Sequence, residues 1–352
     1  LITRLLIVEH RSTGKLSLST FYARRLRRLL PASLAVLLAV IGWTAVAGAP
    51  SALVPTRGDI VATLAYVANW RFVATDVDYF GLAGTVSPLR HFWSLAVEEQ
   101  FYVLWPVLVA VVLGARRSRN NQRLLLGVTA ALAVASAVWI AAVFDPVAPT
   151  RAYFGTDTRA HQMLIGALAG MVQARGMVSL GRCRAWAQVG ALGALGAFML
   201  LLDGSDAAYF RGGSVAVAMV AALLIVATVE EGAGPVDRAL SWRPVLGLGA
   251  ISYAVYLWHW PVIRWLPYGD GAPFLERRMV DLGRFVITIA LATASFRLFE
   301  NAIRRGGLPW VRTVTWRTLV VALLASLTVL GVAVALLTPS SDDEAAFAAT
   351  DQ

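Results

Sequence analysis

Residues 124–143, LLLGVTAALAVASAVWIAAV, contain no charged side chain, and this stretch decides the fold class. A helix needs about 20 apolar residues to cross the hydrocarbon core of a bilayer, which is about 30 Å thick. The chain has 352 residues, of which 58% are hydrophobic and 15% are charged. Soluble domains carry about 25% charged residues. We therefore expect an all-α, polytopic membrane helical bundle, and we exclude a globular cytosolic protein and a disordered one.

The same criterion predicts about nine spans. They lie at 30–48, 95–113, 124–143, 161–174, 186–202, 213–229, 246–266, 281–299 and 318–337. The stretch 60–74 is apolar but interrupted, so we expect it to be a re-entrant or surface segment. Residues 1–8 resemble the end of a span. Because the chain begins with Leu1 inside this stretch, we expect an incomplete N-terminus.

Basic residues are distributed unevenly between the loops. One set of alternating loops is 1–29, 114–123, 174–185, 230–245 and 300–317, and it holds 20 Lys and Arg, against 8 in the other set. The positive-inside rule places the first set in the cytoplasm and the acidic tail from Thr338 outside. The net charge of +10 therefore indicates membrane topology rather than binding of nucleic acid.

Few residues are placed for metal or redox chemistry. Cys183 is the single cysteine, which excludes an intramolecular disulfide and a CxxC site. The four histidines show neither HxxxH nor HExxH spacing, so we expect no metal.

The densest polar cluster is SPLRHFWSLAVEEQFY at 87–102, which runs from an outer loop into a span. Ser94, Glu98 and Tyr102 are four residues apart and share one helix face, and His91 precedes the expected helix by one turn. A carboxylate at membrane depth is costly, and Glu98 and Glu99 lie near the outer face. These residues predict a pocket for a hydroxyl substrate, with His91 or a glutamate transferring a proton.

A second interpretation of this cluster is an interfacial anchor. Trp93 and its aromatic neighbours would then lie at the level of the lipid headgroups, and a glutamate would satisfy amides at the helix N-terminus.

The segment FYARRLRRLLP at 21–31 lies on the cytoplasmic side just before a span. Arg25 and Arg28 would project together from a helix, and Arg24 is adjacent. Arginine suits bidentate binding of phosphate. The alternative is a positive-inside anchor that contacts anionic lipid.

Two further segments contain polar residues near the outer face. In ISYAVYLWHWP at 251–261, His259 lies within a span and either contacts substrate or is a structural residue that bonds a neighbouring carbonyl. In YFGTDTRAH at 153–161, we place Asp157 and Arg159 in an outer loop and interpret His161 as a residue of a helix interface.

Together these segments resemble the membrane acyltransferase-3 family, the integral-membrane O-acyltransferases that modify bacterial surface glycans. The matching segments are 21–31, SPLRHFWSLAVEEQFYVLWP at 87–106, TRAHQMLIGALAG at 158–170, 251–261 and SFRLFENAIRR at 295–305. Their order and spacing agree over nearly the whole chain. In the last segment, Asn301 and Ala302 stand where an Arg/Lys-Pro pair is common in the family.

The resemblance implies transfer of an acyl group, usually acetyl, from cytoplasmic acyl-CoA to a carbohydrate hydroxyl outside a bacterial cytoplasmic membrane. Arg25 and Arg28 match the family's cytoplasmic RxxR and would hold CoA phosphates, with Arg24 beside them. The outer-face motif would lie at the glycan acceptor. Its expected proton carriers are His91, Glu98 and Glu99, and its expected substrate contacts are Trp93, Ser94 and Tyr102. In the segment 251–261, Tyr253 and His259 are further expected substrate contacts.

One departure from the family concerns its proposed catalytic histidine, which lies in a first span, ten residues after an Arg or Lys. That span is not in this sequence, so we expect either a truncated start or a lost base. Restoring it would complete a family core of ten spans plus one.

The resemblance also implies a domain organisation. Residues 1–10 would end the truncated span and 11–299 would form the acyltransferase domain. Residues 300–337 would be a loop and an extra outward-running span, and 338–352 would be an extracytoplasmic tail leading to an SGNH-type esterase or transferase domain.

Two other functions remain open at this point. A transporter or flippase of a glycan or lipid-linked sugar would show a polar path through several helices or a two-fold repeat, and the sequence displays neither. An inactive remnant would fit the missing catalytic span.

Overall fold

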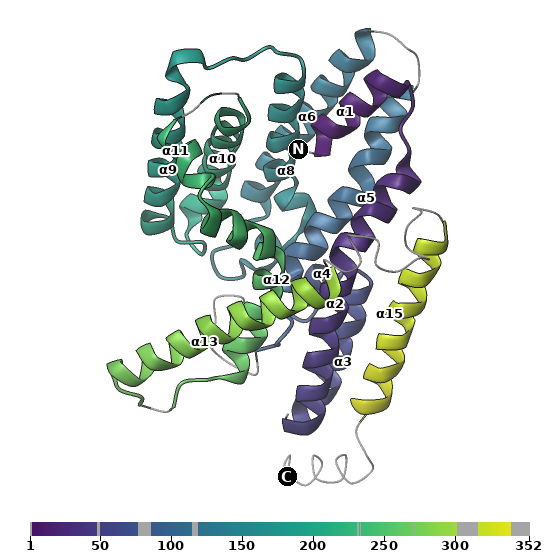
Figure 1. Cartoon of the computed structure of the whole chain (residues 1–352), viewed down its shortest axis with the longest axis vertical. Coiled ribbons are helices and arrows are strands. Elements are labelled where there is room, and N and C mark those ends of the chain that lie inside the picture. The colour runs from purple at the N-terminus through teal and green to yellow at the C-terminus, as the bar shows by residue number, and fades with distance from the viewer. Residues whose placement is uncertain are drawn as a thin grey trace. The chain divides into compact units, whose positions relative to one another are not determined.

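The computed structural model describes residues 2–47, 50–76, 86–114, 119–230, 232, 234–269, 271–300 and 316–338, and every regular element within them is a helix (Figure 1). This confirms the predicted all-α class. The chain divides into two units. Unit 1 is Leu1–Leu16, Phe72–Gly81 and Ala96–Leu246, and unit 2 is Ser17–Arg71, Leu82–Leu95 and Gly247–Gln352.

In unit 1, α8 is the central helix, because α1, α6 and α10 all pack against it and α9 packs on α10 (Figure 1). The helices are α1 (Ile2–Thr13), most of α5 (Phe92–Gly114), α6 (Arg119–Val143), α7 (Thr150–Phe154), α8 (Thr156–Ala174), η1 (Gly181–Cys183), α9 (Arg184–Leu201), η2 (Tyr209–Gly213), α10 (Ser214–Val229) and α11 (Pro235–Leu240). Phe144 and Phe210 stack with ring centroids 4.3 Å apart and anchor a buried apolar cluster.

In unit 2, the long helix α2 is the axis on which α3, α15 and η3 pack (Figure 1). The helices are α2 (Leu18–Ala47), α3 (Pro50–Leu64), the start of α4 (Ala68–Ala74), the start of α5, most of α12 (Arg243–Trp265), α13 (Phe274–Ser295), η3 (Phe296–Glu300) and α15 (Trp316–Leu336). A turn at Tyr66, with φ 54°, separates α3 from α4 and divides the stretch 60–74 between two short helices.

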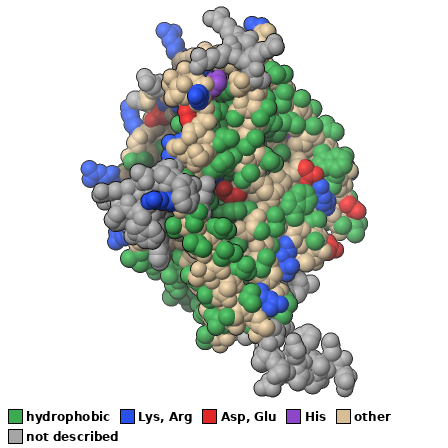
Figure 2. All heavy atoms as spheres, turned by 90° about the vertical axis from the view of Figure 1, so that its right-hand side faces the viewer, with side chains coloured by type: hydrophobic (Ala, Val, Ile, Leu, Met, Phe, Trp, Pro, Cys, Tyr) green, Lys and Arg blue, Asp and Glu red, His purple; other side chains and the backbone are tan. Residues whose placement is uncertain are grey.

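Within the residues that the structure describes, seven helices are long and apolar enough to cross a membrane. They are Leu18–Ala47, Phe92–Gly114, Asn120–Val143, Gly181–Leu201, Tyr209–Val229, Arg243–Trp265 and Phe274–Leu298. Hydrophobic side chains cover much of the face drawn in Figure 2. An exposed apolar surface of this extent would be unfavourable in water but is favourable in contact with the acyl chains of lipid. The chain is therefore a multi-pass membrane protein.

These seven helices coincide with seven of the nine predicted spans. The other two predicted spans, 161–174 and 318–337, fall on α8 and α15, which are helical. For α15, the apolar part that is described is Val320–Leu336. The total of nine stays a prediction.

The start of α2 differs from the predicted span, which began at residue 30. The helix begins at Leu18 and runs unbroken through the arginine-rich segment and Pro31. Arginine, leucine and alanine are strong helix formers, so the helix extends well beyond its apolar part.

Candidate functional site

The first part of the motif predicted to lie near the outer face forms a cluster in unit 2. There residues 87–94, here named the His91 segment, meet α12. The Tyr256 hydroxyl donates a hydrogen bond to the His91 carbonyl oxygen, 2.6 Å away. Trp260 Nε1 donates to the Ser87 carbonyl oxygen, 2.9 Å away. The structure thus brings together two motifs that lie more than 160 residues apart in the chain.

Ser94 completes the contact with Tyr256. Its Oγ lies 2.5 Å from the Tyr256 hydroxyl oxygen. A carbonyl only accepts hydrogen bonds, so the single Tyr256 hydroxyl proton goes to His91 and the Ser94 hydroxyl donates to Tyr256. Tyr256 therefore connects α12 to His91, just before α5 begins at Phe92, and to Ser94, in the first turn of α5.

His91 is the most buried titratable group of the cluster, with 6% of its surface exposed. Among the described residues, neither of its ring nitrogens has a hydrogen-bond partner of normal geometry. Burial, together with the nearby charge of His259, holds the pKa of His91 well below its usual range, although the Leu257 carbonyl opposes this effect. The imidazole is therefore neutral at pH 7 and able to accept a proton.

His259 lies beside His91, with ring centroids 5.5 Å apart and planes at 76°. Its Nδ1 is 2.5 Å from the carbonyl oxygen of Tyr256. The carbonyl can only accept, so Nδ1 carries the proton in the neutral ring and Nε2 is left as an acceptor.

Arg90 and Trp260 border the cluster. The Arg90 guanidinium carbon lies 4.7 Å from the centre of the Trp260 ring, within the range of a cation–π interaction. Trp93 is half-buried in the first turn of α5.

An ion pair that sequence reasoning missed adjoins the His91 segment. Arg71 Nε donates to Asp59 Oδ1 at 2.6 Å, and the Asp59 side chain is 7% exposed. Burial raises the pKa of Asp59, while hydrogen bonds from Ser87 and Arg71 lower it. The contact with Ser87 ties α3 to the start of the His91 segment.

Glu98, Glu99 and Tyr102 follow on α5, within unit 1. Glu98 is exposed, Glu99 is buried and Tyr102 is half-buried. Because α5 is continuous from Phe92 to Gly114, the predicted shared face of Ser94, Glu98 and Tyr102 is present in the helix.

Tyr253, predicted as a substrate contact, joins α12 to α2. Its hydroxyl donates to the Leu29 carbonyl at 3.1 Å and lies 2.7 Å from Ser33 Oγ. This hydroxyl thus holds two membrane helices together.

The basic segment is helical, as the interpretation of Arg25 and Arg28 required. Arg24 and Arg28 are exposed and Arg25 is half-buried. Their spacing of three and four residues places them on neighbouring positions of the first turns of α2.

The outer loop expected around Asp157 and Arg159 is wrong, because both residues lie in the first turn of α8. Arg159 is buried, with Tyr153 and Tyr209 stacked on its guanidinium. Hydrogen bonds from Thr158 and Arg159 to nearby carbonyls stabilise this turn as helix.

His161 is fully buried, and its Nε2 lies 3.1 Å from Ser214 Oγ on α10, as expected of an interface residue.

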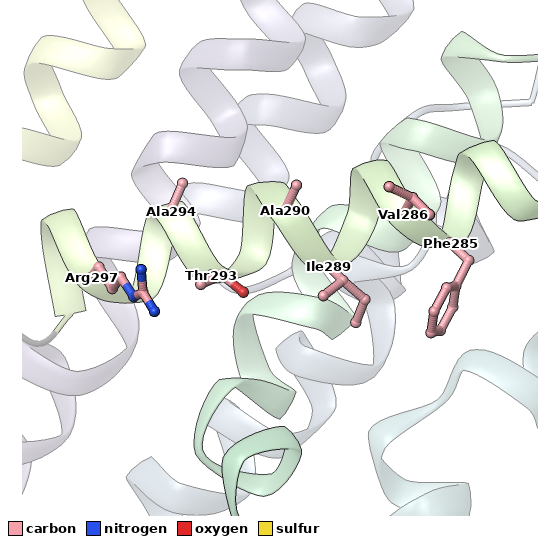
Figure 3. Close-up of a pocket in the computed structure, with 7 residues that line it drawn as sticks. All are labelled: Phe285, Val286, Ile289, Ala290, Thr293, Ala294 and Arg297. Atoms are coloured by element: carbon pink, nitrogen blue, oxygen red, sulfur yellow. The ribbon is translucent and has the colours of Figure 1, made fainter. Parts of the chain in front are cut away.

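A separate open groove of about 520 Å³ runs along α13 (Figure 3). Figure 3 shows Phe285, Ile289, Thr293 and Arg297 along one stripe of the helix, each four residues from the next. The groove contains none of the predicted site residues.

Among the described residues, no group of three or more histidine, cysteine or carboxylate side chains could hold a metal ion.

Comparison with known proteins identifies the class to which this fold and site belong. A family model described as an acyltransferase domain matches residues 5–338. The chain therefore belongs to this acyltransferase family, which confirms the resemblance. No solved structure matches the chain at a significant level.

The relatives name a more particular chemistry. The chain is 34% identical over 318 residues to the peptidoglycan O-acetyltransferase OatA of Listeria monocytogenes. This match covers 87% of the chain and 50% of the relative. It is 31% identical over 342 residues to the O-acetyltransferase OatA of Staphylococcus aureus. That match covers 92% of the chain and 55% of the relative. The chain spans about half the length of the curated relatives it matches.

Sequence reasoning overlooked Tyr256, Ser87 and Asp59. For Tyr256 a signal was present, because it lies three residues before His259 and so shares a helix face with it. Ser87 and Asp59 carry no such signal, since their contact joins segments that only the folded chain brings together.

Proposed function

We propose that the protein is an O-acetyltransferase of the bacterial cytoplasmic membrane that acetylates a hydroxyl of an extracytoplasmic glycan, with peptidoglycan as the acceptor. The observation that carries this proposal is the family match over residues 5–338, together with the printed activity of the relatives. The donor is a cytoplasmic acyl-CoA. The glycan and membrane lipid are the other partners.

The donor end of the proposal lies at Arg24, Arg25 and Arg28. CoA carries phosphate groups, and guanidinium groups bind phosphate through paired, charge-assisted hydrogen bonds. The exposure of Arg24 and Arg28 leaves room for such a ligand. The excess of basic residues in this set of loops supports a cytoplasmic position.

The acceptor end lies at the start of α5. The glycan hydroxyl oxygen bonds to the acetyl carbonyl carbon, and the bond between that carbon and the CoA sulfur breaks. The hydroxyl proton passes to a base, and the thiolate takes up a proton as it leaves. His91, Glu98 and Glu99 are the candidate proton carriers, and Trp93, Ser94, Tyr102 and His259 are the candidate substrate contacts.

A general base must start unprotonated, and the His91 imidazole is neutral at pH 7. His91 has no ring hydrogen bond of normal geometry among the described residues, so a ring nitrogen is available to a substrate hydroxyl. In the neutral ring, Nε2 of His259 offers a second acceptor beside it. An SGNH-type domain that receives the acetyl group stays a prediction of the family resemblance.

Membranes that contain the protein test this proposal. They are incubated with acetyl-CoA labelled in the acetyl group, and ester-linked label in peptidoglycan is measured after mild alkaline release. We expect label that depends on the protein and falls in His91→Gln and Arg25→Ala/Arg28→Ala membranes. Label that is equal with and without the protein would contradict the proposal.

A further inference from the structure

We propose that Tyr256 is the positioning residue that fixes both imidazoles of the outer-face cluster. It holds His91 through its side chain and His259 through its main chain. Its importance for acetyl transfer rests on the proposed function, whereas its effect on the two rings follows from the contacts alone.

The side-chain contact acts on the position of His91. The Tyr256 hydroxyl donates to the His91 carbonyl at 2.6 Å and accepts from the Ser94 hydroxyl at 2.5 Å. These two bonds hold both the turn that ends at His91 and the first turn of α5 against α12. The Tyr256 ring also lies 5.6 Å from the His91 ring, centroid to centroid.

The hydrogen bond to the main chain acts on the proton of His259. The Tyr256 carbonyl accepts from Nδ1 of His259, three residues further along α12. This bond selects one tautomer and one ring orientation, and the Tyr256 and His259 rings pack with centroids 5.4 Å apart.

His91 has no ring hydrogen bond of normal geometry to hold it among the described residues. Its orientation therefore comes from packing, from the weak contact with the Leu257 carbonyl and from the backbone that carries it. The hydroxyl of Tyr256 is the contact that pins this backbone to α12, which makes it the group on which the His91 position depends.

The two roles can be separated by one substitution. Tyr256→Phe removes the hydroxyl but keeps the ring and the carbonyl. It should therefore release the His91 segment while the bond from His259 Nδ1 remains. A general loosening of α12 would instead affect both histidines.

The direct test is carbethoxylation of histidine by diethyl pyrocarbonate, which needs a neutral, accessible ring nitrogen. The full chain is used in lipid nanodiscs, and modification at each histidine is followed by mass spectrometry. His161 is fully buried in unit 1 and serves as an internal reference. The matched control is Tyr268→Phe, which removes a hydroxyl that donates to Asp281 at 2.6 Å.

Tyr256→Phe removes both hydrogen bonds of this hydroxyl. We expect His91 to react about tenfold faster than in the wild type, the effect of losing the one bond of ordinary strength that reaches the His91 carbonyl. His259 and His161 should react at the wild-type rate, and Tyr268→Phe should change none of them. Ser94→Ala, which removes only the second bond, should give a smaller rise at His91. An unchanged His91 rate in both variants, or equal rises at His91 and His259, would overturn the proposal.

Kinetics then separate this inference from the proposed function. If the wild type transfers acetyl, Tyr256→Phe should lower kcat and shift its pH profile while the KM for acetyl-CoA stays unchanged. A wild-type rate and pH profile in the variant would contradict the positioning role in catalysis. If the wild type transfers no acetyl, the proposed function fails, and the labelling rates still decide whether Tyr256 fixes the two rings.

Discussion

The imidazole rings of His91 and His259 lie 5.5 Å apart, and the His91 ring is buried. Two protonated rings at this distance would repel each other in a medium that solvates them poorly. The site is therefore built to keep His91 neutral, which has a consequence for the pH dependence of stability.

We predict that the folded protein loses stability as the pH falls below about 6.5, because the unfolded chain binds a proton at His91 that the folded chain resists. The stabilising contribution is fully present above this pH and is lost toward lower pH by at most about 1.4 kcal/mol per pH unit. Thermal unfolding in detergent should show a smaller drop of Tm in His91→Gln than in the wild type between pH 7.5 and pH 5.5. Equal drops would contradict the buried neutral state.

A second prediction concerns Gly58, which lies against Arg71 of the Asp59–Arg71 ion pair. A Cβ at Gly58 would clash with the Arg71 guanidinium, the mobile end of that side chain. Gly58→Ala should displace Arg71, leave Asp59 buried without its partner and cost about 1–3 kcal/mol. In an Arg71→Ala background the same substitution should cost almost nothing, which a double-mutant cycle of unfolding free energies measures. Additive costs would show that the clash does not act through Arg71.

Hydropathy predicted the spans because membrane helices must be apolar over a fixed length. The helix over 119–143 exceeds the stretch 124–143 by only a few residues at one end. The same criterion could not find the start of α2, since the Arg-rich first turns are good helix formers without being apolar. It also placed Arg159 in a loop, because a charge suggests solvent, whereas two tyrosine rings cover this arginine in a helix.

The site was predictable only in part. The motif residues His91, Ser94 and His259 were found from polar side chains at unusual depth. The contacts that connect them pass through the hydroxyl of Tyr256, and an aromatic residue in an apolar helix is not distinguishable from packing until its partner is known.

A further prediction concerns Asp237, which lies in the first turn of α11 in unit 1. Its Oδ2 lies 2.5 Å from Arg184 Nη2, and hydrogen bonds from Arg184, Gly234 and Gln188 lower its pKa to about 2. Because the folded pKa lies below the unfolded value of about 3.9, this contribution is present above that pH and is lost as the pH falls toward 2.

Asp237→Asn should therefore lower Tm by a few degrees at pH 7. The difference from the wild type should shrink at pH 3. The control is Asp206→Asn, an exposed carboxylate that makes no ion pair among the described residues, and it should leave Tm unchanged. A difference as large at pH 3 as at pH 7 would show that the asparagine acts through shape rather than charge.

The arginines of α2 distinguish a donor site from a lipid anchor. Arg25→Ala and Arg28→Ala should each raise the KM for acetyl-CoA about tenfold, as expected for the loss of a charge-assisted bond to phosphate. Arg317→Ala, an exposed arginine at the start of α15, should leave this KM unchanged. A pure anchor would instead lower the amount of inserted protein in all three variants and leave KM at the wild-type value.

The measurement that tests the central claim most directly is the sidedness of the transfer. Sealed vesicles of each orientation are given labelled acetyl-CoA, which does not cross the bilayer, with peptidoglycan precursor at the opposite face. We predict labelled acetyl ester on the glycan only when the donor is at the face that carries Arg25 and Arg28. Label in the other orientation alone, or no protein-dependent label in either, would contradict a transferase that takes acetyl from cytoplasmic CoA to an external glycan.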